Sequence, residues 1–185
     1  MNGTDYLEGG IDLDNVAELA YEIEMAGVDA IEVSGGTWDC LVQSEEVLGF
    51  PPVPAAESHT RIRKPEKQSY FLPYAERLDV GIPILLVGGN RDAERLEAIL
   101  RRGKVDFVSL CRPLICEPDL PNRWKEGRGE IIAACISCNS CLYDMYTGLD
   151  RGVPGVVRCV RNEDPRRVSE AQRWLSTFVA ENAVA

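Results

Sequence analysis

Apolar residues in the segment 12–26 recur at intervals of three and four, at Leu13, Val16, Ala17, Ala20 and Ile23. This spacing predicts a helix that Asp12 caps and Gly27 ends. The same spacing predicts helices over residues 68–78, where Pro73 kinks the helix or shifts its start, and over residues 92–102. A capping box of Ser169 and Gln172 begins a further predicted helix, residues 169–182.

Three short segments, residues 28–34, 82–87 and 105–110, are predicted to be strands, and the middle one is apolar on both faces. Strands of this kind that alternate with helices are typical of a parallel sheet covered by helices. The sequence therefore predicts an α/β fold. Residues 37–67 show no clear period and include Pro-rich and basic stretches, so they are predicted to form a long loop that acts as a lid or a binding segment.

Length and charge narrow the function classes. The chain has 185 residues, enough for one domain and a small extension. A net charge of −10 without a basic stripe argues against a nucleic-acid partner. We find no run of about 18 apolar residues and no secretory signal, so the sequence predicts a cytoplasmic protein without a membrane span. In that reducing compartment, its seven cysteines are more often ligands than cross-links.

Two predicted strand ends carry residues suited to an anion. Gly88, Gly89 and Asn90 follow the strand 82–87 and directly precede a helix, where backbone N–H groups can approach a phosphate closely. Arg112 follows the strand 105–110 and can bind a phosphate through a forked hydrogen bond. The alternative is that the glycines only form a tight turn and that Arg112 pairs with a surface carboxylate.

Four cysteines form the strongest pattern in the chain. Cys135, Cys138 and Cys141 are separated by two residues each, and Cys159 follows after seventeen more. Three cysteines in one run with a fourth remote is closer to iron–sulfur sites than to zinc sites, which commonly use two separate pairs. The spacing therefore favours an iron–sulfur cluster, with a zinc site and metal-free thiols as alternatives. The remaining cysteines lack such spacing and are interpreted as ordinary, partly buried thiols: Cys40, Cys111 and Cys116.

Six segments occur in a characteristic order: "NGTDYLEGG", "AGVDAIEVSGG", "IPILLVGGNR", "VDFVSLCRPLI", "EPDLPNRWKEGR" and "CISCNSC". Together they resemble the Old Yellow Enzyme-like NADH:flavin oxidoreductases, in the branch that includes dienoyl-CoA reductase and trimethylamine dehydrogenase. The resemblance runs from Asn2 to about Pro165. It implies an FMN-binding (β/α)8 TIM barrel, followed in several members by a 4Fe–4S cluster.

By this resemblance, the FMN phosphate loops are formed by Gly88, Gly89, Asn90, Cys111 and Arg112. The cluster ligands are Cys135, Cys138, Cys141 and Cys159. Residues 1–128 are then expected to run from the end of barrel strand five to strand eight, and residues 129–185 to form the cysteine-cluster extension and the C-terminal helix. A full barrel takes about 250 residues, so the expectation is the C-terminal half of one. No catalytic residue is assigned, and His59 is predicted to lie on the surface or in a lid.

The resemblance implies an FMN-dependent oxidoreductase that uses NAD(P)H and a small-molecule substrate, with the cluster relaying single electrons. The alternative is a non-catalytic half-barrel, or a partner subunit with a structural metal site. A half-barrel exposes open sheet edges and an uncovered apolar face, which invite pairing with another chain. We therefore expect a homo-oligomer or pairing with an N-terminal half.

Overall fold

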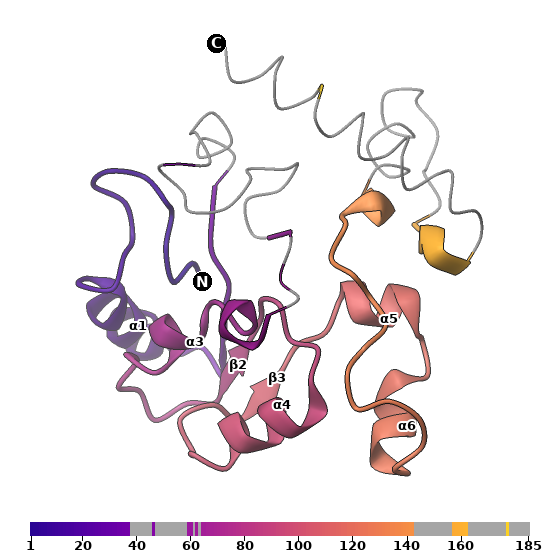
Figure 1. Ribbon diagram of the computed structural model, residues 1–185. Coiled ribbons are helices and arrows are strands. Elements are labelled where there is room, and N and C mark those ends of the chain that lie inside the picture. The colour runs from indigo at the N-terminus through magenta and orange to yellow at the C-terminus, as the bar shows by residue number, and fades with distance from the viewer. Residues whose placement is uncertain are drawn as a thin grey trace.

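The computed structural model describes residues 1–37, 46, 59–60, 62, 64–142, 157–162 and 177. Its centre is a parallel sheet in the order β1-β2-β3, formed by β1 (Ile31–Val33), β2 (Ile84–Leu86) and β3 (Phe107–Val108) (Figure 1). Ile31 is paired with Ile84, and Leu86 with Val108. The predicted α/β fold with parallel strands is confirmed. Each strand is shorter than predicted because only its central residues pair with a neighbour.

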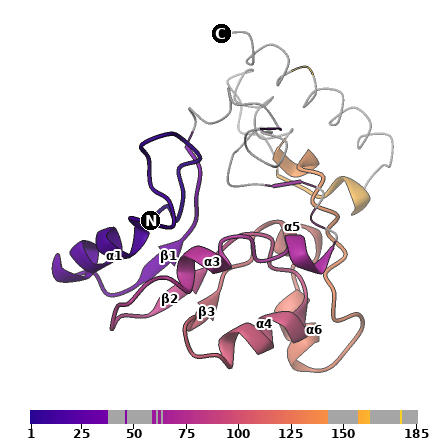
Figure 2. The same cartoon turned by 60° about the vertical axis from the view of Figure 1, so that its left-hand side comes forward.

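Helices cover one face of this sheet. The predicted helices are α1 (Val16–Met25), α3 (Leu72–Ala75) and α4 (Ala93–Leu100). In Figure 2, α1 lies beside β1 at one end of the sheet, and α4 lies beside β3. The core joins alternate strand residues to the apolar sides of the helices: Val16, Ala20, Ile31, Val33, Ile84, Leu86, Leu96 and Ile99. This arrangement follows from the two periods, 2.0 in strands and 3.6 in helices.

The ends of the helices show which local signals were correct. Asp92 caps α4, since its carboxylate accepts the N–H of Arg95 at 3.2 Å. Pro73 lies in the first turn of α3, so it shifts the start of that helix rather than kinking it. The predicted cap Asp12 is wrong: α1 begins at Val16, and Asp12 accepts the N–H groups of Asp14 and Asn15 in a turn before it.

The N-terminal segment runs parallel to β1. Asn2 forms an isolated parallel bridge with Ser34. The Gly3 N–H donates to the Ser34 carbonyl at 2.8 Å, and the Ser34 N–H donates to the Met1 carbonyl at 3.0 Å. The sheet is therefore extended on the β1 side by a short fourth parallel segment.

The second face of the sheet carries the residues that alternate with the core positions. Glu32, Leu85 and Phe107 are aligned across the three strands by the register. Glu32 is exposed, Leu85 is half-buried, and Phe107 is 57% exposed. Within the described residues, helices therefore cover one face of the sheet and leave the other accessible.

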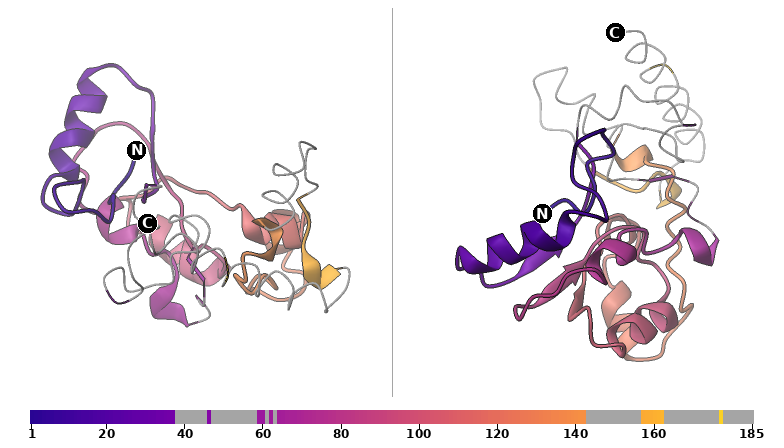
Figure 3. Two further views of the ribbon diagram at one scale, coloured as in Figure 1. Left: turned by 90° about the horizontal axis from the view of Figure 1, so that it is seen from above. Right: turned by 90° about the vertical axis from the view of Figure 1, so that its left-hand side faces the viewer.

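Beyond β3 the chain forms α5 (Arg112–Cys116) and α6 (Leu120–Lys125). Two short 3-10 helices also belong to the described part: η2 (Pro65–Lys67) before α3 and η3 (Val160–Asn162) after α6. In α6, Leu120 is fully buried and Trp124 packs against the core, whereas most of residues 121–130 are exposed. Figure 3 shows α1 and the cysteine-bearing segments at opposite ends of the molecule.

Two predictions fall mostly outside the described part of the chain. The long loop 37–67 is described only at its two ends and at a few positions between them, and the helix 169–182 only at Thr177. Cys40 also lies outside the described residues. In the part of the chain that the structure describes, none of the helices combines the length and the apolar character that crossing a membrane would need.

Candidate functional site

The cysteine loop, residues 135–141, turns twice through a left-handed backbone conformation. Ser137 has a φ angle of 55° and Asn139 one of 57°. This region is uncommon for residues other than glycine and costs about 1–2 kcal/mol per residue. The fold must therefore supply contacts that hold both residues in place.

The four predicted ligands, three from this loop and Cys159 from another segment, line one pocket. Its lining includes Cys135, Cys138, Cys141 and Cys159, and the other lining residues are Arg112, Ile115, Ile136, Asn139 and Arg161. Cys159 comes from the segment 157–162, which is separated from the cysteine loop in sequence. The spacing in the sequence thus predicted a set of thiols that the fold does gather around one cavity.

The thiols of this pocket do not form a site for one metal ion in the described part of the chain. Among the described residues, no group of three or more His, Cys, Asp or Glu side chains has the geometry to hold a single ion. All six cysteines that the structure describes are free thiols, Cys111 and Cys116 included. The pocket is therefore a loose cage of four thiols and not a closed tetrahedral site.

Two arginines, one after each of two neighbouring strands, hold the left-handed residues of the loop. Arg91 is only 6% exposed, and its Nη1 donates to Ser137 Oγ at 3.0 Å. Its Nη2 donates to the Ala133 carbonyl at 3.4 Å. Arg112 Nη1 donates to Asn139 Oδ1 and to the His59 carbonyl, the latter at 2.8 Å. The ends of β2 and β3 therefore position the cysteine loop.

Burial opposes ionisation of the thiols. Burial raises the pKa of Cys141 to about 12, although the positive charge of Arg112 acts in the opposite direction. Burial also raises the pKa of Cys135, against the N–H of Ser137, which donates to its sulfur at 3.4 Å, and against both arginines. In the metal-free chain these thiols are therefore protonated at neutral pH, and metal binding would release protons.

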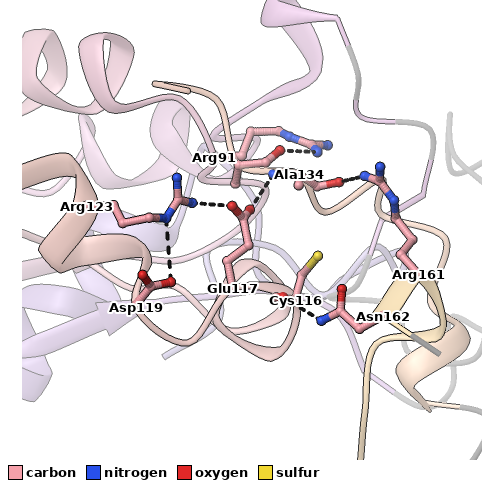
Figure 4. A network of polar contacts seen from close by, with 9 residues as sticks. Arg91, Cys116, Glu117, Asp119, Arg123, Ala134, Arg161 and Asn162 are labelled. Carbon is pink, nitrogen blue, oxygen red and sulfur yellow. Dashed lines mark hydrogen bonds and ion pairs between the residues drawn. The ribbon is translucent and has the colours of Figure 1, made fainter. Parts of the chain in front are cut away.

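Ala134, which precedes Cys135, is held through both its N–H and its carbonyl (Figure 4). The Ala134 N–H donates to the Glu117 carboxylate, and the Ala134 carbonyl accepts a hydrogen bond from Arg161. Glu117 also pairs with Arg123 of α6. These contacts tie the start of the cysteine loop to α5, α6 and the segment 157–162.

The predicted phosphate turn has the expected backbone but also a role in packing. Gly88 and Gly89 have φ angles of 98° and 71°. A Cβ atom on Gly88 would lie 2.7 Å from the Tyr70 ring, and one on Gly89 would lie 2.8 Å from the same ring. The need for space beside Tyr70 explains both glycines without any ligand. Their predicted contact with a phosphate remains a prediction.

Asn90 links the two strand ends. It is 3% exposed, and its Nδ2 donates to the Leu86 carbonyl at 2.7 Å and to the Ser109 carbonyl at 3.2 Å. Its Oδ1 is buried and has no hydrogen-bond partner within the described residues. Asn90 therefore joins the ends of β2 and β3, and its Oδ1 acceptor has no partner within the described residues.

Arg112 retains donors for an anion. In the part of the chain that the structure describes, both of its hydrogen bonds use Nη1, so its Nε and Nη2 groups remain available. Cys111, which precedes it, is exposed, so the interpretation of this thiol as partly buried is wrong. A guanidinium with donors left over is compatible with an anionic ligand, whereas the Asn90 Oδ1 is an acceptor and would need a donor instead.

Comparison with known proteins gives a consistent result, although no family model matches the chain. The chain is 33% identical over 141 residues to an NADH oxidase of Thermoanaerobacter brockii, covering 75% of this chain and 19% of that protein. It is 32% identical over 126 residues to an NADH-dependent flavin oxidoreductase of Hypocrea jecorina, covering 65% of this chain and 29% of that protein.

A solved structure supports the fold. The complex of 2-naphthoyl-CoA reductase with 2-naphthoyl-CoA superimposes on the chain with a TM-score of 0.64 and 23% identity. The match covers 92% of this chain and 23% of the reductase. The chain is a relative of the NADH:flavin oxidoreductases. The resemblance identified from the sequence is thus confirmed, and the chain spans only about a fifth to a third of the length of these relatives.

In this relative of the flavin oxidoreductases, His59 is buried, so the surface position is wrong, whereas its alternative, a lid, stays a prediction. It is 8% exposed, and its ring stacks on Tyr70 with the ring centroids 3.8 Å apart. The Tyr6 hydroxyl forms a hydrogen bond with His59 Nε2 over 3.2 Å. Burial, and then the charge of Arg112, lower the pKa of His59 to about 3. The imidazole is therefore neutral at physiological pH.

Sequence reasoning missed two residues of this candidate site. Arg91 directly follows the predicted glycine turn, and this position was the only feature of the sequence that could have indicated its role. Cys116 was interpreted as an ordinary, partly buried thiol, yet it is only 5% exposed and its thiol lies close to that of Cys159. Burial first, and then that contact, raise the pKa of Cys116 to about 12. No cysteine spacing in the sequence pointed to this contact.

Proposed function

We propose that the chain is part of an FMN-dependent NAD(P)H oxidoreductase in which it carries the FMN phosphate site and a 4Fe–4S cluster. One observation carries the proposal: four thiols line one pocket, and the wall of that pocket includes Arg112, the predicted phosphate ligand. One side chain would then contact both groups. The relatives named as NADH oxidase and NADH-dependent flavin oxidoreductase support the reaction class.

The geometry favours a cluster over a zinc ion. Four thiolates on one zinc ion lie at Zn–S distances of about 2.3 Å, which requires the sulfur atoms to be close together. A 4Fe–4S cluster takes one thiolate at each of four irons, so its ligands stand farther apart. The four thiols line one cavity, and among the described residues they do not form a site for a single ion, so the lining leaves room for the cluster interpretation. Ile115 and Ile136 would shield it from water.

The FMN phosphate would be held by Arg112 through Nε and Nη2, and by the backbone around Gly88, Gly89, Asn90 and Cys111. When bound, FMN supplies hydride chemistry and the cluster supplies single-electron transfer. The chain's own residues bind and orient: Arg112 would fix the phosphate while its Nη1 holds Asn139 in the cysteine loop. We assign no proton-transfer residue, because His59 is buried and neutral.

We also propose that the chain forms the C-terminal half of a TIM barrel, residues 1–128, followed by the cysteine extension, residues 129–185. The accessible sheet face with Glu32 and Phe107 corresponds to a barrel interior. The parallel bridge between Asn2 and Ser34 corresponds to an adjacent barrel strand. We expect the missing neighbours to come from an N-terminal half or from a second copy of the chain. A small-molecule substrate, NAD(P)H and a cytoplasmic location complete the proposal.

A non-catalytic role remains the second candidate because of Tyr70. Its ring fills the space beside Gly88 and Gly89, so the turn is explained by packing alone. In that case the thiol pocket would be a structural metal site.

Anaerobic purification of the chain, with a visible spectrum and assays of iron, sulfide, zinc and FMN, separates these candidates. The proposal predicts about four irons and four sulfides per chain, a broad absorbance near 400 nm, and bound or added FMN with bands near 450 nm. A colourless chain with one zinc ion would contradict the cluster. A brown chain that binds no added FMN would leave the cluster in place and overturn the flavin assignment.

A further inference from the structure

The thiols of Cys116 and Cys159 are in contact although they are far apart in sequence. Cys116 is the last residue of α5, and Cys159 directly precedes η3. Their thiol groups lie close enough to interact with each other. Cys159 also lines the thiol pocket, whereas Cys116 is not among the pocket's lining residues. Cys159 therefore lies between the pocket on one side and a fifth thiol on the other.

The backbone around this pair is fixed by polar contacts. Asn162 Nδ2 donates to the Cys116 carbonyl at 2.8 Å, and the Asn162 N–H donates to the Cys159 carbonyl at 3.0 Å. Asn162 thus contacts both cysteines at once. Arg161, which directly precedes Asn162, donates to the Ala134 carbonyl, as Figure 4 shows. The two cysteines are consequently held next to each other by the fold.

We propose that Cys116 and Cys159 form a reversible disulfide in the metal-free chain, and that this bond excludes the cluster. The disulfide itself depends only on the contact between the two side chains. Its competition with metal binding rests on the proposed function, because there Cys159 is a cluster ligand. A sulfur bonded to Cys116 cannot also bind iron, so Cys159 has two mutually exclusive states.

Glutathione disulfide, or another small disulfide, is the oxidant. Cys159 is half-buried, so its sulfur is the accessible one. It attacks one sulfur of the oxidant, the oxidant's S–S bond breaks, and one glutathione leaves as a thiol. The Cys116 sulfur then attacks Cys159 Sγ in this mixed disulfide, and the second glutathione leaves. Two electrons and two protons have passed from the two cysteines to the oxidant, and one S–S bond has replaced another.

The test uses the full chain with the substitution Cys111→Ser. Trypsin releases Cys159 in the peptide 159–161, and the cysteine loop in the peptide 129–151. Cys111 and Cys116 share the peptide 105–123 because the Arg112–Pro113 bond resists cleavage, so Cys111→Ser leaves Cys116 as the only thiol there. The metal-free chain is incubated with glutathione disulfide, alkylated, digested without reductant and analysed by mass spectrometry. A second sample is first loaded with iron and sulfide.

We expect the peptide 159–161 to be recovered mainly in a disulfide with the peptide 105–123, and to be released by reductant. Loading with the cluster should lower that linkage about tenfold or more by mass action. In a further Cys116→Ser variant, Cys159 should be recovered as the glutathione mixed disulfide. Linkage of Cys159 to the peptide 129–151, or no linkage, would overturn the proposal.

The two proposals fail in different ways. If the chain takes up no cluster but still links Cys116 to Cys159, the disulfide stands and the proposed function fails. If the chain binds a cluster but the metal-free form never links these two cysteines, the proposed function stands and the disulfide is wrong. Equal linkage in the loaded and metal-free samples would refute the competition alone.

Discussion

Arg91 lies five residues after the end of β2, just before α4. It donates a hydrogen bond to Ser137 of the cysteine loop over 3.0 Å. The arginine is 6% exposed, and the serine is 3% exposed. Burial of a guanidinium is costly unless its donors are satisfied. This contact therefore fixes the position of the loop relative to the sheet, and it makes Arg91 a residue on which both depend.

Replacing Arg91 with alanine should lower the free energy of unfolding by about 1–3 kcal/mol, because Ser137 Oγ and the Ala133 carbonyl lose their donors. Urea denaturation measures the change. Arg101→Ala is the matched control: its salt bridge with Glu97 is exposed, so its loss should cost within about 0.5 kcal/mol. Equal effects of the two substitutions would show that the buried contacts of Arg91 do not stabilise the fold.

The buried His59 should make the chain sensitive to acid. Its pKa is about 3 in the folded chain and 6.5 in the unfolded chain, so between these values the unfolded chain binds more protons. The stabilising contribution of neutral His59 is therefore complete above pH 6.5 and decreases as the pH falls toward 3. The loss by about pH 4 should be on the order of a few kcal/mol.

Carboxylates also titrate in this range, so the measurement needs a comparison with His59→Phe. Phenylalanine keeps a ring against Tyr70 but cannot bind a proton. Unfolding free energies at about pH 7 and about pH 4 should differ less in this variant than in the parent chain. Identical pH dependence in both would mean that His59 is protonated in the folded chain as readily as in water.

Gly89→Ala should destabilise the chain more than Gly103→Ala. The two glycines have nearly equal φ angles, 71° and 74°. A Cβ at Gly89 would lie 2.8 Å from the Tyr70 ring, while one at Gly103 would meet nothing within 4 Å. Both variants pay the cost of a left-handed backbone on a residue with a Cβ atom. Only Gly89→Ala adds an overlap with the Tyr70 ring, which costs about 1–3 kcal/mol. Chemical denaturation of both variants gives the difference, and equal losses would mean that Tyr70 moves aside.

Cys138→Ser should abolish cluster absorbance and lower the iron content, while leaving most of the bound FMN in place. Serine removes one thiolate from the pocket but no group from the predicted phosphate turn. Iron, sulfide and FMN assays on the same sample test this. Cys111→Ser, at an exposed thiol outside the pocket, should keep its iron. Loss of FMN together with iron in Cys138→Ser would show that the two sites form one folding unit.

Arg112→Ala should weaken FMN binding by about 1.5–3 kcal/mol, the range for a hydrogen bond to a charged group, which is roughly a tenfold or greater rise in Kd. Titration calorimetry with FMN measures it. Arg112→Lys keeps the charge without the forked donors, so its affinity for FMN should lie between those of the parent chain and Arg112→Ala. If neither substitution changes the affinity, Arg112 serves only His59 and Asn139.

Local sequence patterns were sufficient for the framework of the fold. The apolar spacing around Leu96 and Ile99 predicted α4, and Asp92 was correctly placed at its start. The pattern of residues 82–87 predicted a strand buried between neighbours. These features depend on residues close together in the chain, where spacing and capping rules apply.

Long-range contacts account for what the sequence did not reveal. His59 is buried because Tyr6 and Tyr70 pack against it, and neither residue is near it in sequence. The left-handed conformations of Ser137 and Asn139 lack the glycine that normally signals them, since arginines from distant strand ends stabilise them instead. The contact between Cys116 and Cys159 likewise arises only when η3 packs on α5.

The dependence of two left-handed loop residues on Arg91 and Arg112 has a consequence for how such a motif can be transferred. The three clustered cysteines occupy one short run of sequence, but the guanidinium groups that shape this run belong to the preceding strand ends. A graft of residues 129–185 onto another scaffold would bring the sulfur atoms without the groups that orient them. The proposed metal-binding unit would therefore be larger than its ligand motif and would include the carboxyl edge of the sheet.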